Sequence, residues 1–213
     1  MSGLFITFEG TEGSGKSTQI GLTAEWLRSQ GREVLTIREP GGTPIGEEIR
    51  HLLKHSEANR NMTPEAELLL MNASRAQLVR EVIRPALAEG NVILCDRFYD
   101  STTVYQGHGR QLDMASVKSV VDFAVGNCRP DLTLLLQVSV SVSEARRAAR
   151  DEEQNGLRDR FEEAERSFFE RVEEGYAALV KAEPDRVKEV DATASVDEVQ
   201  TSVRELINRA LNP

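Results

Sequence analysis

The stretch "FITFEGTEGSGKST" (residues 5–18) decides the fold class of this chain. It contains the spacing G-x-x-x-x-G-K-S, which begins at Gly10 and lies between an apolar, strand-like run and a segment with helical spacing. Glycines let the backbone turn tightly and point its N–H groups inward, and the start of the following helix adds positive potential. The stretch therefore predicts a loop that binds phosphate groups. The same loop contains a carboxylate, Glu12, although its expected ligand is a polyanion.

Two further side chains of the loop suit a nucleoside triphosphate. Lys16 is expected to reach the β- and γ-phosphates, and the Ser17 hydroxyl is expected to coordinate Mg²⁺. A chance glycine-rich turn is the alternative, but the complete spacing between a strand and a helix argues against it. The chain has no Asn-Lys-x-Asp segment for reading guanine, which argues against a GTPase, and no ABC-type signature. The rest of the chain has to distinguish the remaining classes.

The composition is that of an ordinary globular protein, with 39% hydrophobic and 29% charged residues among 213. No apolar run of about 18 residues is present, and the N-terminus lacks the pattern of a signal peptide, so we expect a cytoplasmic protein without a membrane span. A net charge of −9 argues against a nucleic-acid partner, although a local arginine cluster can still attract a small anion. Cys95 and Cys128 are far apart in the sequence, and we expect two buried free thiols.

Apolar segments rich in β-branched residues alternate with segments of helical spacing. The strand-like segments are Leu4–Phe8, Glu33–Ile37, Val92–Cys95, Leu132–Val138 and Val187–Val190. Helical spacing covers roughly 16–30, 44–54, 64–89, 113–126, 141–150, 160–182 and 195–210. This alternation predicts an α/β fold in which a five-stranded parallel sheet is flanked by helices, as a single domain over residues 1–213. Ligands of such sheets bind beyond the carboxyl ends of the strands.

Several expected helix ends carry local signals. Thr63-Pro64 is typical of an N-cap followed by proline at the first helical position, and Gly90 suits the end of the same helix. Pro85 is expected to kink that helix. The segment 195–198 has the spacing of a capping box.

Arginines follow the second and third strand-like segments. Arg38 leads into the turn at 40–42, and Arg50 lies on the next helix, from which it can point back. Asp96 ends a buried strand, where a second acidic group near Mg²⁺ is expected, and Arg97 follows it directly. An unpaired Asp-Arg sequence at a buried strand end is costly, so it forms either an internal ion pair or a ligand site. Surface positions remain the alternative for the other two arginines.

Two residues suit the recognition of a nucleobase or sugar, and an arginine on the long helix before them is a further candidate for a ligand contact. Tyr105 and Gln106 supply an aromatic ring and an amide, and ordinary packing is their alternative role. Met71 and Arg75 are four residues apart on one helical face beside apolar neighbours. Arg75 is thus either a partly buried cation that needs an anionic or planar partner, or an arginine that reaches the surface.

The polar stretch "DEEQNGLRDR" (residues 151–160) is either a solvated loop or a mobile lid. Arg146 and Arg150 precede it on one helical face, with Arg147 adjacent, and further arginines follow at 158 and 160. A run of charges on a helix is usually solvated. Beside a flexible loop of a phosphate-binding protein, such an arginine can close over a phosphoryl group in transfer.

Together these residues predict two anion sites that face each other. One holds a nucleoside triphosphate, and the other, built from Arg38, Arg50 and Arg97, holds a second phosphate. A phosphomonoester acceptor needs no strong general base, because its second pKa is about 6 and it is already a dianion at neutral pH. The protein then supplies position, charge neutralisation and exclusion of water.

The chain closely resembles the bacterial thymidylate kinase family from the first strand nearly to the C-terminus. The P-loop, residues 10–17, is common to a whole superfamily. The segments "REPGGT" and "DRFYDSTTVYQGHGR" are together highly specific, and "AELLLMNASRAQLV", "RPDLTLLLQV" and "DRFEEAERSFFERV" also match. The resemblance implies a P-loop fold of the nucleoside monophosphate kinase type with a small mobile lid around 146–160. It also implies transfer of a phosphoryl group from ATP to dTMP with Mg²⁺, and a homodimer.

The resemblance further implies a role for each matching residue. The catalytic residues would be Lys16, Arg97, Arg150, Arg146 and Glu12. ATP would bind Gly10, Thr11, Glu12, Gly13, Ser14, Gly15, Lys16, Ser17, Thr18, Arg146, Arg150, Asp191 and Thr193. The substrate dTMP would bind Glu12, Arg38, Glu39, Arg50, Met71, Arg75, Arg97, Ser101, Thr102, Tyr105 and Gln106. Mg²⁺ would be held by Ser17 and, through water, by Asp96. Because the P-loop contains no arginine, the bacterial pattern with a catalytic arginine in the lid is expected.

Two positions depart from the family pattern. Met71 stands where many members have a phenylalanine that stacks on thymine; a thioether still packs on an aromatic face, for about 0.3–1.5 kcal/mol. His108 interrupts a run that is often all glycine. A kinase for another nucleoside monophosphate therefore stays open as the alternative. For Glu12 we expect a contact with the acceptor: a hydrogen bond from the sugar 3′-hydroxyl, or an ion pair with a phosphate-binding arginine.

Overall fold

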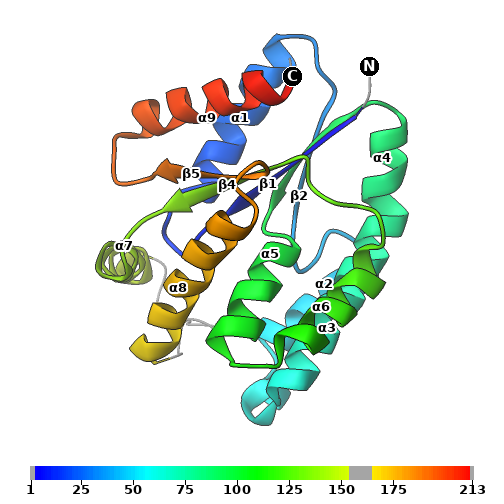
Figure 1. The fold of residues 1–213 in the computed structure, drawn as a ribbon, viewed down its shortest axis with the longest axis vertical. Coiled ribbons are helices and arrows are strands. Elements are labelled where there is room, and N and C mark those ends of the chain that lie inside the picture. The colour runs from blue at the N-terminus through cyan, green and yellow to red at the C-terminus, as the bar shows by residue number, and fades with distance from the viewer. Residues whose placement is uncertain (1–2, 154–164, 212–213) are drawn as a thin grey trace.

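The computed structural model of the chain describes residues 3–153 and 165–211 (Figure 1). Five strands form one parallel sheet in the order β2-β3-β1-β4-β5. The strands are β1 (Leu4–Glu9), β2 (Val34–Arg38), β3 (Val92–Asp96), β4 (Leu132–Gln137) and β5 (Val187–Asp191). The predicted α/β fold with five parallel strands is confirmed, with strand bounds shifted by a single residue.

The long helices lie in the segments where helical spacing was found. They are α1 (Lys16–Ser29), α2 (Pro44–Lys54), α3 (Pro64–Leu78), α4 (Arg84–Ala88), α6 (Met114–Val125), α7 (Val140–Glu153), α8 (Arg166–Ala182) and α9 (Val196–Leu211). The signals at their ends act as predicted: Thr63 Oγ1 accepts from Ala66 N, and Ser195 and Glu198 bond each other as a capping box. The predicted segment 160–182 begins in residues outside the described part.

Helices cover both faces of the sheet (Figure 1). On one face α1 and α9 pack against strand residues such as Phe8 and Leu134. On the other face α3, α4 and α6 pack around Phe5 and Ile93, while α8 closes a third apolar cluster. The central strands are apolar along their length because both of their faces are buried. Both cysteines are buried and free, as predicted.

Two segments differ in detail from the sequence prediction. The helix expected over 64–89 with a kink at Pro85 is divided by a π-helical turn, Val79–Ile83, directly before Arg84-Pro85; an irregularity was expected near Pro85, but its π-helical form was not. The wide turn accommodates a proline that lacks an N–H and would otherwise crowd the preceding turn. In addition, the segment after β3, expected to be irregular, is helical: α5 (Tyr99–Thr102) continues into a π-helix, Thr103–Gly109. A short 3₁₀ helix, Glu57–Asn61, was also not predicted.

Within the described ranges, no helix is long and apolar enough to cross a membrane.

Candidate active site

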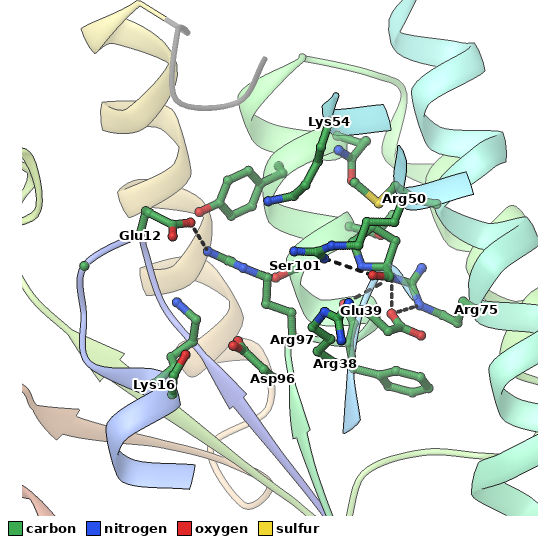
Figure 2. Close-up of a pocket in the computed structure, with 18 of the residues that line it drawn as sticks. Glu12, Lys16, Arg38, Glu39, Arg50, Lys54, Arg75, Asp96, Arg97 and Ser101 are labelled. Atoms are coloured by element: carbon green, nitrogen blue, oxygen red, sulfur yellow. Dashed lines mark hydrogen bonds and ion pairs between the residues drawn. The ribbon is translucent and has the colours of Figure 1, made fainter. Parts of the chain in front are cut away.

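A cavity of about 380 Å³ lies beyond the carboxyl ends of β1, β2 and β3 (Figure 2). Most of the predicted site residues line it: Glu12, Gly13, Gly15, Lys16, Ser17, Thr18, Arg38, Glu39, Arg50, Met71, Arg75, Asp96, Arg97, Ser101, Thr102, Tyr105 and Gln106. Gly10, Thr11, Ser14, Arg146, Asp191 and Thr193 lie outside its lining. The side chain of Arg150, and most of the predicted lid, fall outside the described residues.

The P-loop follows β1 and ends at the first turn of α1. Gly10 has φ 132°, and a Cβ at this position would collide with the carbonyl oxygen of Leu136 in β4. Gly13 and Gly15 also have positive φ, 77° and 91°. The sequence therefore folds here into a tight turn against the end of β4, which non-glycine residues adopt only with strain.

Lys16 is folded back onto this loop. Its Nζ donates to the carbonyl oxygens of Thr11 and Gly10 at 2.9 and 3.2 Å, and to Ser14 Oγ at 3.4 Å. Burial, and after it the neighbouring Arg97, lower the pKa of Lys16 to about 8, although the carboxylates of Asp96 and Glu12 act in the opposite direction. The lysine is thus a buried cation bound to carbonyl oxygens at the place where phosphate oxygens are expected.

Helix α7 holds the crest of the P-loop from outside the cavity. Ser143 Oγ donates to the carbonyl oxygen of Glu12 at 2.7 Å. Arg146 donates from Nη1 to Gly13 O at 3.2 Å and from Nη2 to Ala192 O at 3.0 Å. Arg146 therefore joins the P-loop to the segment after β5, where Asp191 Oδ1 accepts from the backbone N and Oγ1 of Thr193.

Arg97 lies between the P-loop and the second part of the cavity (Figure 2). Its φ of 66° is left-handed, which costs a non-glycine residue on the order of 1 kcal/mol. Arg97 Nη2 lies 3.9 Å from Glu12 Oε2, and its guanidinium lies over the ring of Tyr105, 5.0 Å from the centroid. The carboxylate in the phosphate loop thus faces an arginine of the neighbouring strand end.

The other two predicted phosphate ligands enter the cavity from β2 and α2. Arg50 Nη1 donates to the carbonyl oxygen of Pro40 at 3.0 Å. Arg38 Nη2 is bonded to Glu47 Oε2 at 2.8 Å, and half of the Arg38 side chain is exposed. Figure 2 shows Arg38, Arg50 and Arg97 approaching a common space from three elements. A further cation from α2, Lys54, lines the same cavity and was not predicted.

A buried carboxylate that was also not predicted supports Arg97. Glu9 is fully buried at the end of β1; its Oε1 accepts from the backbone N of Phe98 and Ser101, and its Oε2 accepts from Ser101 Oγ at 2.6 Å and Tyr176 OH at 2.9 Å. Both hydroxyl groups in turn accept from Arg97 Nη1, at 3.1 and 3.5 Å. Glu9 is the last residue of β1, just as Asp96 is the last residue of β3. The sequence signal that identified Asp96, an acidic residue at the end of a buried strand, could therefore have identified Glu9 as well.

At the far end of the cavity, Arg75 is almost completely buried, which excludes the alternative of a surface arginine. Its Nε donates to Glu39 Oε2 at 2.7 Å, its Nη1 to Asn72 Oδ1 at 2.8 Å and its Nη2 to Phe98 O at 3.3 Å. Burial raises the pKa of Glu39 to about 7, although Arg75 favours the ionised form. Met71 lines the same end.

The π-helix after α5 places two predicted residues side by side in the lining. Tyr105 packs edge-on against Phe168 and Tyr176. Gln106 Nε2 donates to Glu67 Oε1 at 2.9 Å, so both residues have packing partners and cavity positions at once. His108, which departs from the family pattern, fits against Gly175 of α8, where a Cβ would touch its ring.

The residues near the P-loop fit a Mg²⁺ ion bound largely through water and phosphate oxygens. Asp96 Oδ1 is buried at the end of β3 and has no hydrogen-bond partner within residues 3–153 and 165–211. Ser17 stands in the first turn of α1 in the same cavity lining. No group of three or more His, Cys, Asp or Glu side chains that could enclose a metal ion occurs in those ranges. Mg²⁺ commonly uses a single carboxylate together with substrate phosphates.

Comparisons with known proteins cover nearly the whole chain. The family model "Thymidylate kinase" matches residues 8–203. A thymidylate kinase of Geobacter sulfurreducens is 50% identical over 97% of the chain, and one of Pseudomonas syringae pv. tomato is 48% identical over 99% of the chain. Each match covers 98% of the relative. A crystal structure of thymidylate kinase from Ehrlichia chaffeensis superposes with a TM-score of 0.78 at 30% identity, covering 97% of this chain and all of that one.

A P-loop and a second set of cations, both at the carboxyl edge of a five-stranded parallel sheet, define a P-loop kinase of the nucleoside monophosphate kinase type. The matches over the full chain narrow this class. The chain belongs to the thymidylate kinase family. Its reaction is the ATP-dependent phosphorylation of dTMP to dTDP.

Proposed function

We propose that this chain brings the γ-phosphate of ATP and the phosphate of dTMP together at Arg97. The P-loop with Lys16 holds the donor, and Arg38, Arg50 and Arg97 hold the acceptor phosphate. The observation that carries this assignment is the shared cavity, in which a P-loop lysine and three arginines from β2, α2 and the end of β3 face one space.

Catalysis in this site rests on position and charge. The acceptor phosphate is a dianion at neutral pH and attacks without a strong general base. Arg97 lies between the two phosphate positions, held by Ser101, Tyr176 and the Glu12 carboxylate. A rigid cation at this point neutralises the charge that accumulates on the phosphoryl group in transfer. Such electrostatic stabilisation, together with positioning, is the main source of catalysis in phosphoryl transfer. In addition, Glu12 would accept a hydrogen bond from the sugar 3′-hydroxyl.

Ser17 and, through water, Asp96 would hold Mg²⁺ in the proposed complex. Bound there, the ion would supply positive charge that neutralises part of the negative charge of the triphosphate. The unpartnered Asp96 Oδ1 is the observation in favour of this assignment.

The buried end of the cavity takes the thymine base. Arg75 and Gln106 would contact the base, with Ser101 and Thr102 beside it, and Met71 would pack on its face. Tyr105 would lie against the deoxyribose. Glu39 contributes by holding Arg75 in place through the bond between Glu39 Oε2 and Arg75 Nε.

The remaining expectations concern the lid and the assembly. We place the donor-side arginines Arg146 and Arg150 at the root of a lid around 146–160, within one catalytic domain of residues 1–213. Asp191 and Thr193 would border the adenine. The enzyme would act as a homodimer in the cytoplasm, where ATP is available and thiols stay reduced, in keeping with two buried free cysteines.

A panel of acceptors tests the substrate assignment. Steady-state kinetics with MgATP and dTMP, dUMP, dCMP, dGMP or dAMP should give the highest kcat/KM for dTMP. A higher kcat/KM for another nucleoside monophosphate would support the alternative kinase and contradict the proposal.

A further inference from the structure

The amide of Gln106 has one allowed orientation. Gln106 is 1% exposed, and its Nε2 donates to Glu67 Oε1 at 2.9 Å. The opposite orientation would place the amide oxygen against a carboxylate oxygen, with no hydrogen between them. Within residues 3–153 and 165–211, no side chain or backbone group donates to Gln106 Oε1. Gln106 lines the cavity, so its oxygen is the end of the amide that remains for a ligand.

Glu67 is itself fixed on both carboxylate oxygens. Arg110 Nε donates to its Oε1 at 3.2 Å, and Arg110 Nη2 donates to its Oε2 at 3.1 Å. Arg110 is held in turn by the ring of Phe168, 4.7 Å from its guanidinium carbon. Glu67 has no exposed surface and lies in the first turn of α3, where the helix dipole favours a negative charge. The pair therefore forms a rigid, buried support for Gln106.

Glu67 is not among the residues that line the cavity. Its effect on substrate choice is therefore indirect, and its bond to Gln106 connects it to the cavity. Glu67 does more than fill space, because its hydrogen bond with Gln106 fixes the orientation of the Gln106 amide. Without that bond the amide could adopt either of two orientations related by a rotation of about 180°.

We propose that Glu67 is a positioning residue that determines base selectivity. By turning Gln106 Oε1 toward the acceptor base, it favours pyrimidines that carry an N–H at ring position 3. Thymine and uracil have that donor, whereas cytosine has a bare, accepting nitrogen there. An accepting nitrogen against the amide oxygen leaves two buried acceptors unpaired, which is the kind of mismatch that gives strong discrimination. The inference rests on the proposed placement of the base beside Gln106.

The variant Glu67→Gln tests this role. A glutamine at 67 can donate or accept, so it no longer forces one orientation on Gln106. The ratio of kcat/KM for dTMP to that for dCMP should fall about 10- to 100-fold, the cost of a buried polar mismatch. The ratio for dTMP to dUMP should stay unchanged, because both bases carry the N3–H.

A fall in the dTMP-to-dCMP ratio beside an unchanged dTMP-to-dUMP ratio separates positioning from general damage, which would lower all three activities together and leave both ratios unchanged. A double-mutant cycle with Gln106→Met adds a second check: in that background, Glu67→Gln should have no further effect on the dTMP-to-dCMP ratio. If Glu67→Gln does not fold, Arg110→Lys keeps a cation beside Glu67 but loses the paired hydrogen bonds. It should shift the same ratio in the same direction.

A folded Glu67→Gln enzyme with full discrimination against dCMP would overturn the inference, as would an unchanged ratio in Arg110→Lys or additive effects in the cycle. Failure of the proposed function itself would appear differently. In that case the unmodified enzyme would not prefer dTMP, whatever the residue at 67.

Discussion

At the residue scale, Glu12 and Arg97 explain how a phosphate loop tolerates a carboxylate. Glu12 lies on the side of the loop that faces Arg97, 3.9 Å from its Nη2 (Figure 2). About a third of the Glu12 side chain is exposed, so its charge is partly solvated and its repulsion of a bound triphosphate is screened. The carboxylate thus helps to hold the arginine that we place between the two phosphates.

Replacing Arg97 by alanine tests this placement. Arg97→Ala removes the cation between donor and acceptor, and we expect kcat/KM for dTMP to fall by about 10²–10³, as for loss of one preorganised charge-stabilising group. Arg97→Lys is the matched control. It keeps the charge, but a single ammonium cannot bond Ser101 and Tyr176 and also reach toward Glu12, as Nη1 and Nη2 of the arginine do. Its kcat/KM should lie between those of Arg97→Ala and the unmodified enzyme. Near-normal kcat/KM in a folded Arg97→Ala enzyme would move the bridging role to another residue.

The lowered pKa of Lys16 gives a pH dependence of ATP binding. In the empty site the lysine is half deprotonated at a pH of about 8, and phosphate binding requires the charged form. Affinity is therefore full below pH 8 and falls above it, by at most tenfold per pH unit. Titration calorimetry with MgATP from pH 7 to 9.5 measures this. The phosphates of ATP do not titrate in that range, so a constant Kd would contradict the assigned pKa.

At the element scale, α7 connects the donor site to the predicted lid. Ser143 and Arg146 bind the backbone of the P-loop crest, and Arg146 also reaches the segment after β5. The two ends of the donor site are therefore tied to one helix, whose last turns lead directly into the lid segment. A change in that helix should move the P-loop and the border of the adenine site together.

Two variants on α7 should separate binding from chemistry. Arg146→Ala breaks the bonds to Gly13 and Ala192 and should raise the KM for ATP several-fold. Arg150→Ala, one turn further along, should lower kcat far more than it weakens dTMP binding. Steady-state kinetics in both substrates measures each parameter. The reverse pattern, with kcat lost in Arg146→Ala and kept in Arg150→Ala, would exchange the two roles.

Strands, the P-loop and most cavity residues could be predicted because their signals are local. Arg38 and Asp96 follow apolar strands, and the sheet edge brings such positions together. The carboxylates behind the site gave weaker signals, since their partners are far away in sequence: 167 positions separate Glu9 from Tyr176, and 39 separate Glu67 from Gln106. Only the folded chain shows that these pairs meet.

The helix that ends at Gly109 was missed for a related reason. Glycine lowers helix propensity, and "YQGHG" therefore resembles a loop. In the structure a Cβ at Gly109 would collide with the ring of Phe168 in α8. The glycine permits close packing of two elements about 60 residues apart in sequence, and tertiary contact outweighs local propensity.

At the scale of the whole molecule, two neighbouring helices each carry a large exposed apolar side chain. Phe123 on α6 is 85% exposed and Leu69 on α3 is 58% exposed, and α3 and α6 belong to the same layer beside the sheet. Large exposed apolar side chains that lie on packed neighbouring helices are typical of an interface. We propose this layer as the contact surface of the proposed homodimer.

A charge at Phe123 should disrupt the proposed homodimer. Phe123→Glu places an unpaired carboxylate in the proposed contact, and light scattering after size exclusion should show a monomer where we expect a dimer for the unmodified chain. Lys118→Glu, a charge change elsewhere on α6, is the control for general effects. A monomeric unmodified chain, or an intact Phe123→Glu dimer, would contradict this assignment.

The most direct test of the central claim is a crystal structure with dTMP and a non-hydrolysable ATP analogue bound together. We expect the dTMP phosphate to contact Arg38, Arg50 and Arg97 and to face the γ-phosphate held by Lys16. We expect the base to lie between Met71 and Gln106. A dTMP phosphate bound away from the three arginines, or a base outside the pocket formed by Arg75 and Gln106, would contradict it.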